Sequence, residues 1–136
     1  MADDVLLNKA GNIERCLKRV EEEYRGHESE FETNYTRQDA LILNLLRACE
    51  ASIDGAMHLV RRRRLGLPQE SRDAFRMLEE AGVLDSRLSE PLRRMVGFRN
   101  IAVHNYAELD LTIVRSIVEK NLPDLRDFSR LLISLA

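Results

Sequence analysis

The sequence predicts an all-α protein, an up-down bundle of four to six helices. Apolar residues recur at helical intervals over long stretches, and no segment sustains the alternation of apolar and polar residues that a strand requires. Glycine and proline fall between these stretches, where they end one helix and begin the next. A chain of 136 residues suits one domain, residues 1–136, and is long enough to bury a core without disulfides.

The first helix is expected over about residues 4–25. Its apolar stripe consists of two interleaved seven-residue series, Leu6, Ile13 and Val20, and Ala10, Leu17 and Tyr24. A polar loop over 26–35 ends this helix, and Thr36 with Asp39 resembles the start of a second helix over about 37–63. The second helix is apolar around much of its circumference, which predicts a place at the centre of the bundle or against a partner subunit.

Gly66 and Pro68 end the second helix, and a third is expected over about 70–81, followed by Gly82 at its C-terminal cap. Its apolar residues Ala74, Phe75 and Leu78 are expected to point inward.

The fourth helix is expected to begin near Ser89, with Pro91 in its first turn, and to end at about 104–106. Asp110 can cap a fifth helix. Pro123 either interrupts that helix or starts a final one.

Composition limits the classes of function. The formal net charge of −2 argues against a protein that coats nucleic acid, so any site for a polyanion must be a local patch. Arginine makes up all but three of the 21 basic residues, which suits phosphate contacts and ion pairs. Cys16 and Cys49 are expected to be buried free thiols. The acidic N-terminus and the lack of a long apolar run predict a cytoplasmic protein without a membrane span.

The segment 97–106 carries the strongest chemical signal. Arg99 is an always-charged phosphate binder, His104 can exchange protons near neutral pH, and Tyr106 follows two residues later. On an ideal helix Arg99 and His104 lie about 140° apart, so they share a site only if the helix bends, ends or meets another chain. Asn100 shares a face with His104 and is expected to orient the imidazole or bind a phosphate oxygen. A capping arginine beside a packed histidine is the purely structural alternative.

The string Arg99-(four residues)-His104-Asn105-Tyr106 resembles the RxxxxHxY signature of the HepT-type HEPN proteins. The stretches 38–47, 66–75 and 95–100 also resemble that family, which suggests a match over about residues 5–130. The resemblance implies a minimal all-helical ribonuclease toxin encoded beside an MNT nucleotidyltransferase antitoxin. It further implies a homodimer with the motif at the subunit interface.

From this resemblance we expect a metal-independent endoribonuclease that cuts transfer RNA or messenger RNA. His104 would act as general base and Arg99 would stabilise charge on the phosphate, with no cofactor for cleavage. The resemblance also makes Tyr106 the acceptor for AMP groups that the MntA-like antitoxin transfers from ATP with Mg²⁺. Asn105, where relatives often have an acidic residue, departs from the family pattern.

The densest positive charge is the run Arg61, Arg62, Arg63 and Arg64 at the end of the second helix. It suits an RNA backbone or an acidic partner surface, although arginines at a helix C-terminus also complement the helix dipole.

Weaker signals lie elsewhere on the chain. Asp54 and His58 are four residues apart and could hold a metal, but an ion pair between them is the simpler interpretation, and no third ligand is visible. Arg47, Glu50 and Asp54 could support the site across a subunit interface or pair with one another on a wet face. His27 is expected to be solvated.

Two other functions remain open at this level. The chain could be a non-catalytic helical subunit that binds substrate for a two-component nucleotidyltransferase, or a purely structural dimer, because fold alone does not specify function. The intact Arg99 and His104 favour the ribonuclease, since a scaffold would need neither.

Overall fold

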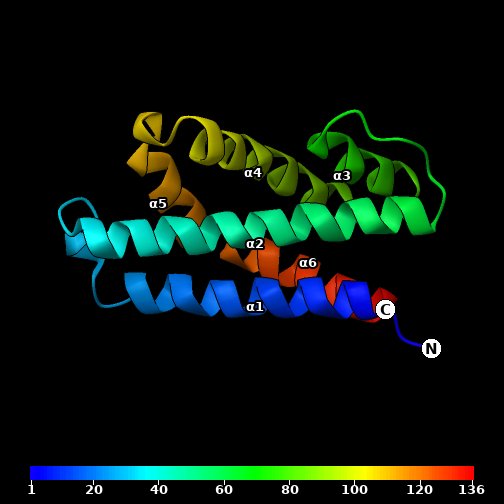
Figure 1. Cartoon of the computed structure of the whole chain (residues 1–136), viewed down its shortest axis with the longest axis horizontal. Coiled ribbons are helices and arrows are strands. Elements are labelled where there is room, and N and C mark those ends of the chain that lie inside the picture. The colour runs from blue at the N-terminus through cyan, green and yellow to red at the C-terminus, as the bar shows by residue number, and fades with distance from the viewer.

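A computed structural model describes all 136 residues, and it contains six α-helices, two short 3₁₀ helices and no strand (Figure 1). The α-helices are α1 (Asp4–Tyr24), α2 (Tyr35–Arg62), α3 (Ser71–Glu80), α4 (Ser86–His104), α5 (Leu111–Lys120) and α6 (Leu122–Leu135). The 3₁₀ helices are η1 (Glu28–Glu30) and η2 (Tyr106–Glu108). The predicted all-α fold is therefore confirmed.

Helix α2 is the centre of the bundle. It packs against α1, α3, α4 and α6, and it runs antiparallel to α1 along the length of the molecule (Figure 1). Helices α3 and α4 lie along the side of α2 opposite α1, and α5 leads back from the end of α4 towards α6. This central place explains why α2 is apolar around so much of its surface, as the sequence predicted.

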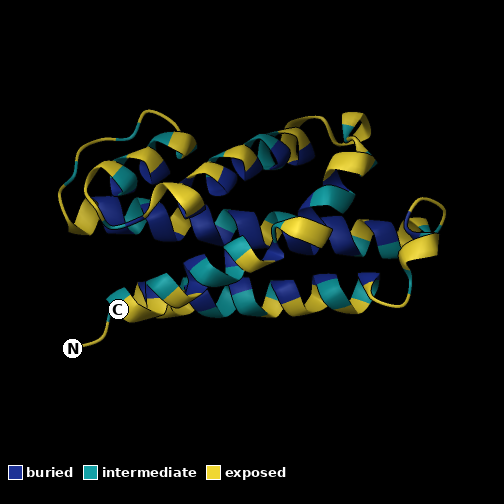
Figure 2. Ribbon diagram, turned by 180° about the vertical axis from the view of Figure 1, so that it is seen from behind, coloured by how far each residue is buried: buried dark blue, intermediate teal, exposed yellow.

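The core is one continuous cluster of 34 buried residues to which all six α-helices contribute (Figure 2). All six residues of the predicted stripe on α1 are buried. Phe75 of α3 and Phe128 of α6 meet edge to face, with ring centroids 5.6 Å apart. At Gly55 a Cβ would lie only 2.8 Å from Leu132 Cδ1, so the glycine lets α6 approach α2 closely.

Two helix starts were predicted wrongly, in both cases because an earlier side chain caps the helix. Asn34 Oδ1 accepts from the Arg37 amide at 3.1 Å, so α2 begins at Tyr35 rather than near Thr36. The Asp85 carboxylate accepts from the Leu88 amide at 2.9 Å and starts α4 one turn before the predicted position. Pro91 consequently lies inside α4 rather than in its first turn.

The other boundaries follow the sequence signals. Gly82 has a φ of 74° just after α3, the left-handed conformation that glycine adopts without strain. Asp110 accepts from the Thr112 amide at 2.9 Å and caps α5. Pro123 lies in the first turn of α6, so of the two possibilities it starts the final helix.

The two cysteines differ in exposure. Both are free thiols, but only Cys49 is buried, and Cys16 is partly accessible, so the prediction of two buried thiols was wrong for Cys16. Burial raises the pKa of the Cys49 thiol to about 12, which keeps it protonated and unreactive. None of the six helices combines the length and the apolar character that crossing a membrane demands.

Candidate active site

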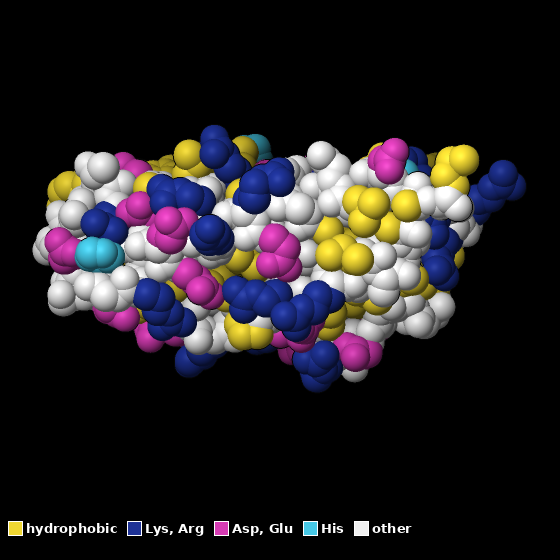
Figure 3. All heavy atoms as spheres, turned by 90° about the horizontal axis from the view of Figure 1, so that it is seen from below, with side chains coloured by type: hydrophobic (Ala, Val, Ile, Leu, Met, Phe, Trp, Pro, Cys, Tyr) yellow, Lys and Arg dark blue, Asp and Glu magenta, His cyan; other side chains and the backbone are white.

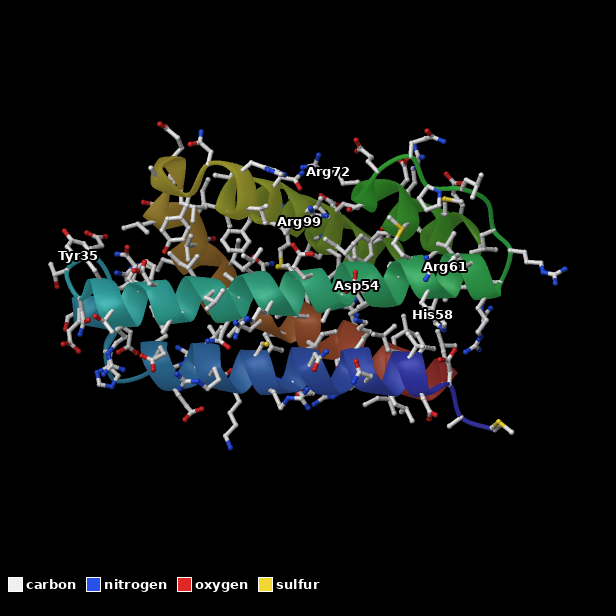
Figure 4. The ribbon with its side chains drawn as sticks, viewed as in Figure 1. Tyr35, Asp54, His58, Arg61, Arg72 and Arg99 are labelled. Carbon is white, nitrogen blue, oxygen red and sulfur yellow. The ribbon has the colours of Figure 1, made fainter.

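Arg99 projects from α4 into the angle between α2 and the start of α3 (Figure 4). Its guanidinium donates to the Ser71 hydroxyl at 2.6 Å, and its Nε lies 3.6 Å from a Glu50 carboxylate oxygen. The side chain is only 18% exposed. One neutral and one ionic contact therefore hold the planar guanidinium in a defined orientation. A guanidinium that binds a phosphate through two hydrogen bonds needs such a fixed orientation.

A hollow of about 230 Å³ opens beside Arg99, lined by Glu70, Ser71, Arg72, Val96, Arg99 and Asn100. Arg72 extends from α3 to α4, where its Nε donates to the Arg93 carbonyl at 3.1 Å. A Cβ at Gly97 would come within 2.9 Å of Arg72 Nη2, so the glycine makes room for this arginine. Figure 4 shows Arg72 and Arg99 on the same side of α2. Two guanidinium groups at a hollow of this size suit an anion such as a phosphate.

His104 is the last residue of α4 and is exposed. No hydrogen bond or ion pair joins it to Arg99 or to Asn100. Asn100 is partly buried and lines the hollow beside Arg99. Within one chain, the predicted separation of Arg99 and His104 around the helix is thus retained.

Apolar side chains surround His104 at the surface. Ile101 is 42% exposed, Val103 is 47% exposed, and Ile113 on α5 is 53% exposed. Next to them a groove of about 610 Å³ runs between α4 and α5, with Phe98, Ile101 and Ile113 among its lining residues. A contiguous apolar surface around a polar residue is typical of an interface with another chain.

Tyr106 lies in η2, directly after α4, and is 45% exposed. Its hydroxyl donates to the Asp39 carboxylate of α2 at 2.5 Å. Partial burial and the adjacent Asp39 carboxylate together raise the pKa of the Tyr106 phenol to about 12. The phenol is therefore fully protonated at neutral pH, and its partial exposure leaves it accessible from outside.

The arginine run at the end of α2 has two components. Arg62 donates to the Asp3 carboxylate at 2.8 Å and to the Leu135 carbonyl at 2.9 Å, so it ties together both ends of the chain. Arg61, Arg63 and Arg64 are exposed and form no ion pair within the chain. Arg64 adopts a φ of 55°, a position at a helix end where glycine or asparagine is more common.

Asp54 and His58 do not pair with each other and do not form a metal site. Asp54 accepts from Lys9 of α1 at 3.3 Å, whereas His58 Nε2 lies 2.8 Å from the Asp3 carboxylate. The simpler interpretation, an ion pair between the two residues, was therefore wrong, because each has a closer partner near the N-terminus. No group of three or more potential ligands occurs in the chain.

The structure also shows the surroundings of the weaker polar candidates. His27 is not simply solvated, since its Nδ1 lies 3.0 Å from a Glu30 carboxylate oxygen. Arg47, Glu50 and Asp54 do not pair with one another, because Glu50 is bound to Arg99. The face of the molecule that carries α1 mixes positive and negative side chains (Figure 3).

Sequence reasoning missed two partners of the site. Ser71 and Arg72 reach the hollow because α3 packs against α4, a long-range contact without a local pattern in the sequence. Glu50 was noticed as a polar residue on an apolar helix. Within the chain, its partner is Arg99.

Comparisons with known proteins identify relatives of this chain. The family model described as Ribonuclease HepT-like matches residues 13–132. The chain is 47% identical over 126 residues to the mRNA nuclease HepT of Shewanella oneidensis, covering 93% of this chain and 94% of that protein. The tri-AMPylated HEPN toxin of the same organism, solved in complex with an MNT antitoxin, superposes with a TM-score of 0.91. That match has 45% identity and covers 97% of this chain and 98% of the other. A toxin–antitoxin solved with AMP-PNP gives a TM-score of 0.91 at 44% identity and covers 97% of this chain and 99% of that one.

Proposed function

The chain belongs to the HepT-like ribonuclease family, and from that premise we propose that it is the RNA-cleaving toxin of a HEPN/MNT toxin–antitoxin pair. The observation that carries the proposal is the geometry of Arg99, which is held by Ser71 and Glu50 at the edge of an anion-sized hollow. The related nuclease is named for messenger RNA, and we propose the same substrate for this chain.

The cleavage we propose is metal-independent. His104 as general base takes the proton of an RNA 2′-hydroxyl, and the 2′-oxygen attacks the adjacent phosphorus as the 5′-oxygen departs and takes a proton from water. Arg99, with Asn100 beside it, stabilises the charge that develops on the phosphoryl oxygens. A general base typically contributes about 10²–10⁴-fold, and oxyanion-type stabilisation about 10²–10³-fold. Such an enhancement suits a toxin that needs few cuts in each essential RNA.

The proposed active form is a homodimer. Arg99 and His104 point to different sides of α4, so one chain alone does not bring them to one phosphate. The exposed apolar residues Ile101 and Val103, which flank His104, support an interface at this end of α4. Across a two-fold axis, the same surface of a second chain would add its own motif to the cleft.

Regulation is proposed to act on Tyr106. The related toxin was solved tri-AMPylated and bound to an MNT antitoxin, and another relative was solved with AMP-PNP. We propose that an MntA-like antitoxin binds this chain and transfers AMP from ATP, with Mg²⁺, to the exposed Tyr106 hydroxyl. Each AMP adds a negative phosphate two residues from His104, where it would repel RNA and compete for Arg99.

The alternatives have less support. A non-catalytic substrate-binding subunit or a purely structural dimer would need neither the intact Arg99 and His104 nor a close relationship, over nearly the whole chain, to a named nuclease.

Expression of the chain alone in bacteria tests the proposal. Growth should stop with wild type and continue with His104→Ala or Arg99→Ala at equal protein levels, and co-expression of the neighbouring nucleotidyltransferase gene should restore growth. Normal growth with abundant, folded wild-type protein would favour the non-catalytic subunit.

A further inference from the structure

The hydroxyl of Tyr106 is bound by one partner, Asp39, which is 67 residues away in the sequence. Asp39 lies on the second turn of α2, and η2 places the tyrosine against it. The oxygen-to-oxygen distance of 2.5 Å lies at the lower end of the range for a hydrogen bond from a hydroxyl to an ionised carboxylate. Proton donor and acceptor are therefore already aligned in the free chain.

The surroundings leave this carboxylate free for Tyr106. Asp39 is exposed and forms no ion pair with any arginine or lysine of the chain. The nearby Arg37 is bound to Glu23 of α1 at 3.3 Å. The titratable groups closest in sequence to Tyr106, His104 and Glu108, make no hydrogen bond or ion pair with it. Asp39 is thus the charged group that acts on the phenol.

We propose that Asp39 is the general base for the modification of Tyr106, so that the toxin supplies a catalytic residue for its own silencing. The proposal rests on the proposed AMPylation. As the Tyr106 oxygen forms a bond to the α-phosphorus of ATP, its proton passes to Asp39. The bond from that phosphorus to the bridging oxygen breaks, and pyrophosphate leaves. Asp39 then returns the proton to water.

A base is needed because the phenol holds its proton tightly. With its pKa raised to about 12, Tyr106 provides almost no phenolate at neutral pH, and attack by the neutral phenol would leave a proton on the new ester oxygen. A carboxylate already hydrogen-bonded to the hydroxyl removes that proton during bond formation, which is the geometric requirement for general base catalysis. Asp39 becomes neutral as the bond forms, so it does not repel the phosphate group of the modified tyrosine.

The test uses the purified chain, its cognate nucleotidyltransferase, ATP and Mg²⁺, and follows addition of the first AMP by intact mass. Asp39→Asn keeps an oxygen that accepts from Tyr106 but cannot take the proton, so the maximal rate should fall about 100-fold with little change in KM for the toxin. Asp39→Glu should restore part of the rate. Glu108→Gln is the matched control, since it removes one carboxylate from the same surface without touching Tyr106, and it should react as wild type does.

A pH series distinguishes a base from a residue that only positions the tyrosine. Without Asp39 the residual reaction depends on hydroxide, so the ratio of wild-type to Asp39→Asn rate should shrink by about tenfold per pH unit towards alkaline pH. A ratio that does not change with pH, or an Asp39→Asn rate equal to or above wild type, would overturn the proposal. Wild-type protein that gains no AMP, or gains it away from Tyr106, would instead refute the proposed regulation itself.

Discussion

Arg99 and His104 are five residues apart on α4 but lie in opposite environments: the Arg99 side chain is 18% exposed and bound to Ser71, whereas His104 is exposed without a partner. A phosphate bound by Arg99 in the hollow beside α3 is thus not automatically within reach of the imidazole of the same chain. This relationship makes the homodimer a requirement of the proposed chemistry.

Mixed dimers test that requirement. Arg99→Ala and His104→Ala chains should each be inactive, but a mixture allowed to exchange subunits should recover about a quarter of wild-type RNA cleavage, because half of the dimers then hold one complete site. Cleavage by the purified mixture, compared with each variant alone, is the measurement. If the mixture stays as inactive as its components, the two residues act within one chain.

The arginine run should separate into a binding part and a structural part. Replacing Arg61, Arg63 and Arg64 with Gln should leave the Tm unchanged and weaken RNA or antitoxin binding. For a single-stranded RNA, the slope of log Kd against the logarithm of the salt concentration should fall by about 2. Arg62→Gln should lower the Tm instead, because it breaks the contacts to Asp3 and to the Leu135 carbonyl. Binding curves that match wild type for both partners would assign the run to helix capping alone.

Glu50 should limit the affinity for RNA. Its carboxylate lies 3.6 Å from Arg99 Nε and must compete with the substrate phosphate for the guanidinium. Glu50→Gln keeps the shape but removes the charge, so the KM for RNA should fall several-fold. Steady-state cleavage of a short RNA gives this value, with Asp54→Asn as a control on the same helix. A higher KM would mean that Glu50 chiefly orients Arg99.

The stability of the fold should depend on Asp3 in acid. The Arg62 guanidinium and the His58 imidazole hold the pKa of the Asp3 carboxyl well below its usual range. The stabilisation is therefore complete above the unfolded-state pKa of about 3.9, and it is lost progressively as the pH falls from there through the lower pKa of the folded state. Asp3→Asn should lower the free energy of unfolding at pH 7 and lower it by a smaller amount near pH 2, as urea titrations at both values can check. An equal difference at both pH values would contradict this assignment.

Much of the fold could be predicted from local patterns. The seven-residue apolar series of α1, the apolar surface of α2, the stop signal at Gly82 and the start signal at Pro123 each reflect physics within a few residues. Both wrong helix starts have one cause. Several capping residues compete within a few positions, and sequence alone did not reveal that Asn34 and Asp85 would bind the free amides.

The site was predictable only in part, for a different reason. The residues of α4 stand together in the sequence, whereas Ser71, Glu50 and Asp39 reach Arg99 and Tyr106 through helix packing. The wrong pairing of Asp54 with His58 has the same origin. A spacing of four residues permits a contact along one helix, but Lys9 and Asp3 approach from α1 and offer better partners.

The most direct test of the central claim is cleavage of a defined messenger RNA by the purified chain in the presence of EDTA. Wild type should cut the RNA and leave 2′,3′-cyclic phosphate ends, while His104→Ala, with equal helicity and the same dimeric state, should be slower by about 10²–10⁴-fold. Arg99→Lys should be as inactive as Arg99→Ala, because an ammonium group cannot reproduce a bidentate guanidinium contact. Loss of wild-type cleavage on chelation, or undiminished cleavage by His104→Ala, would contradict the account.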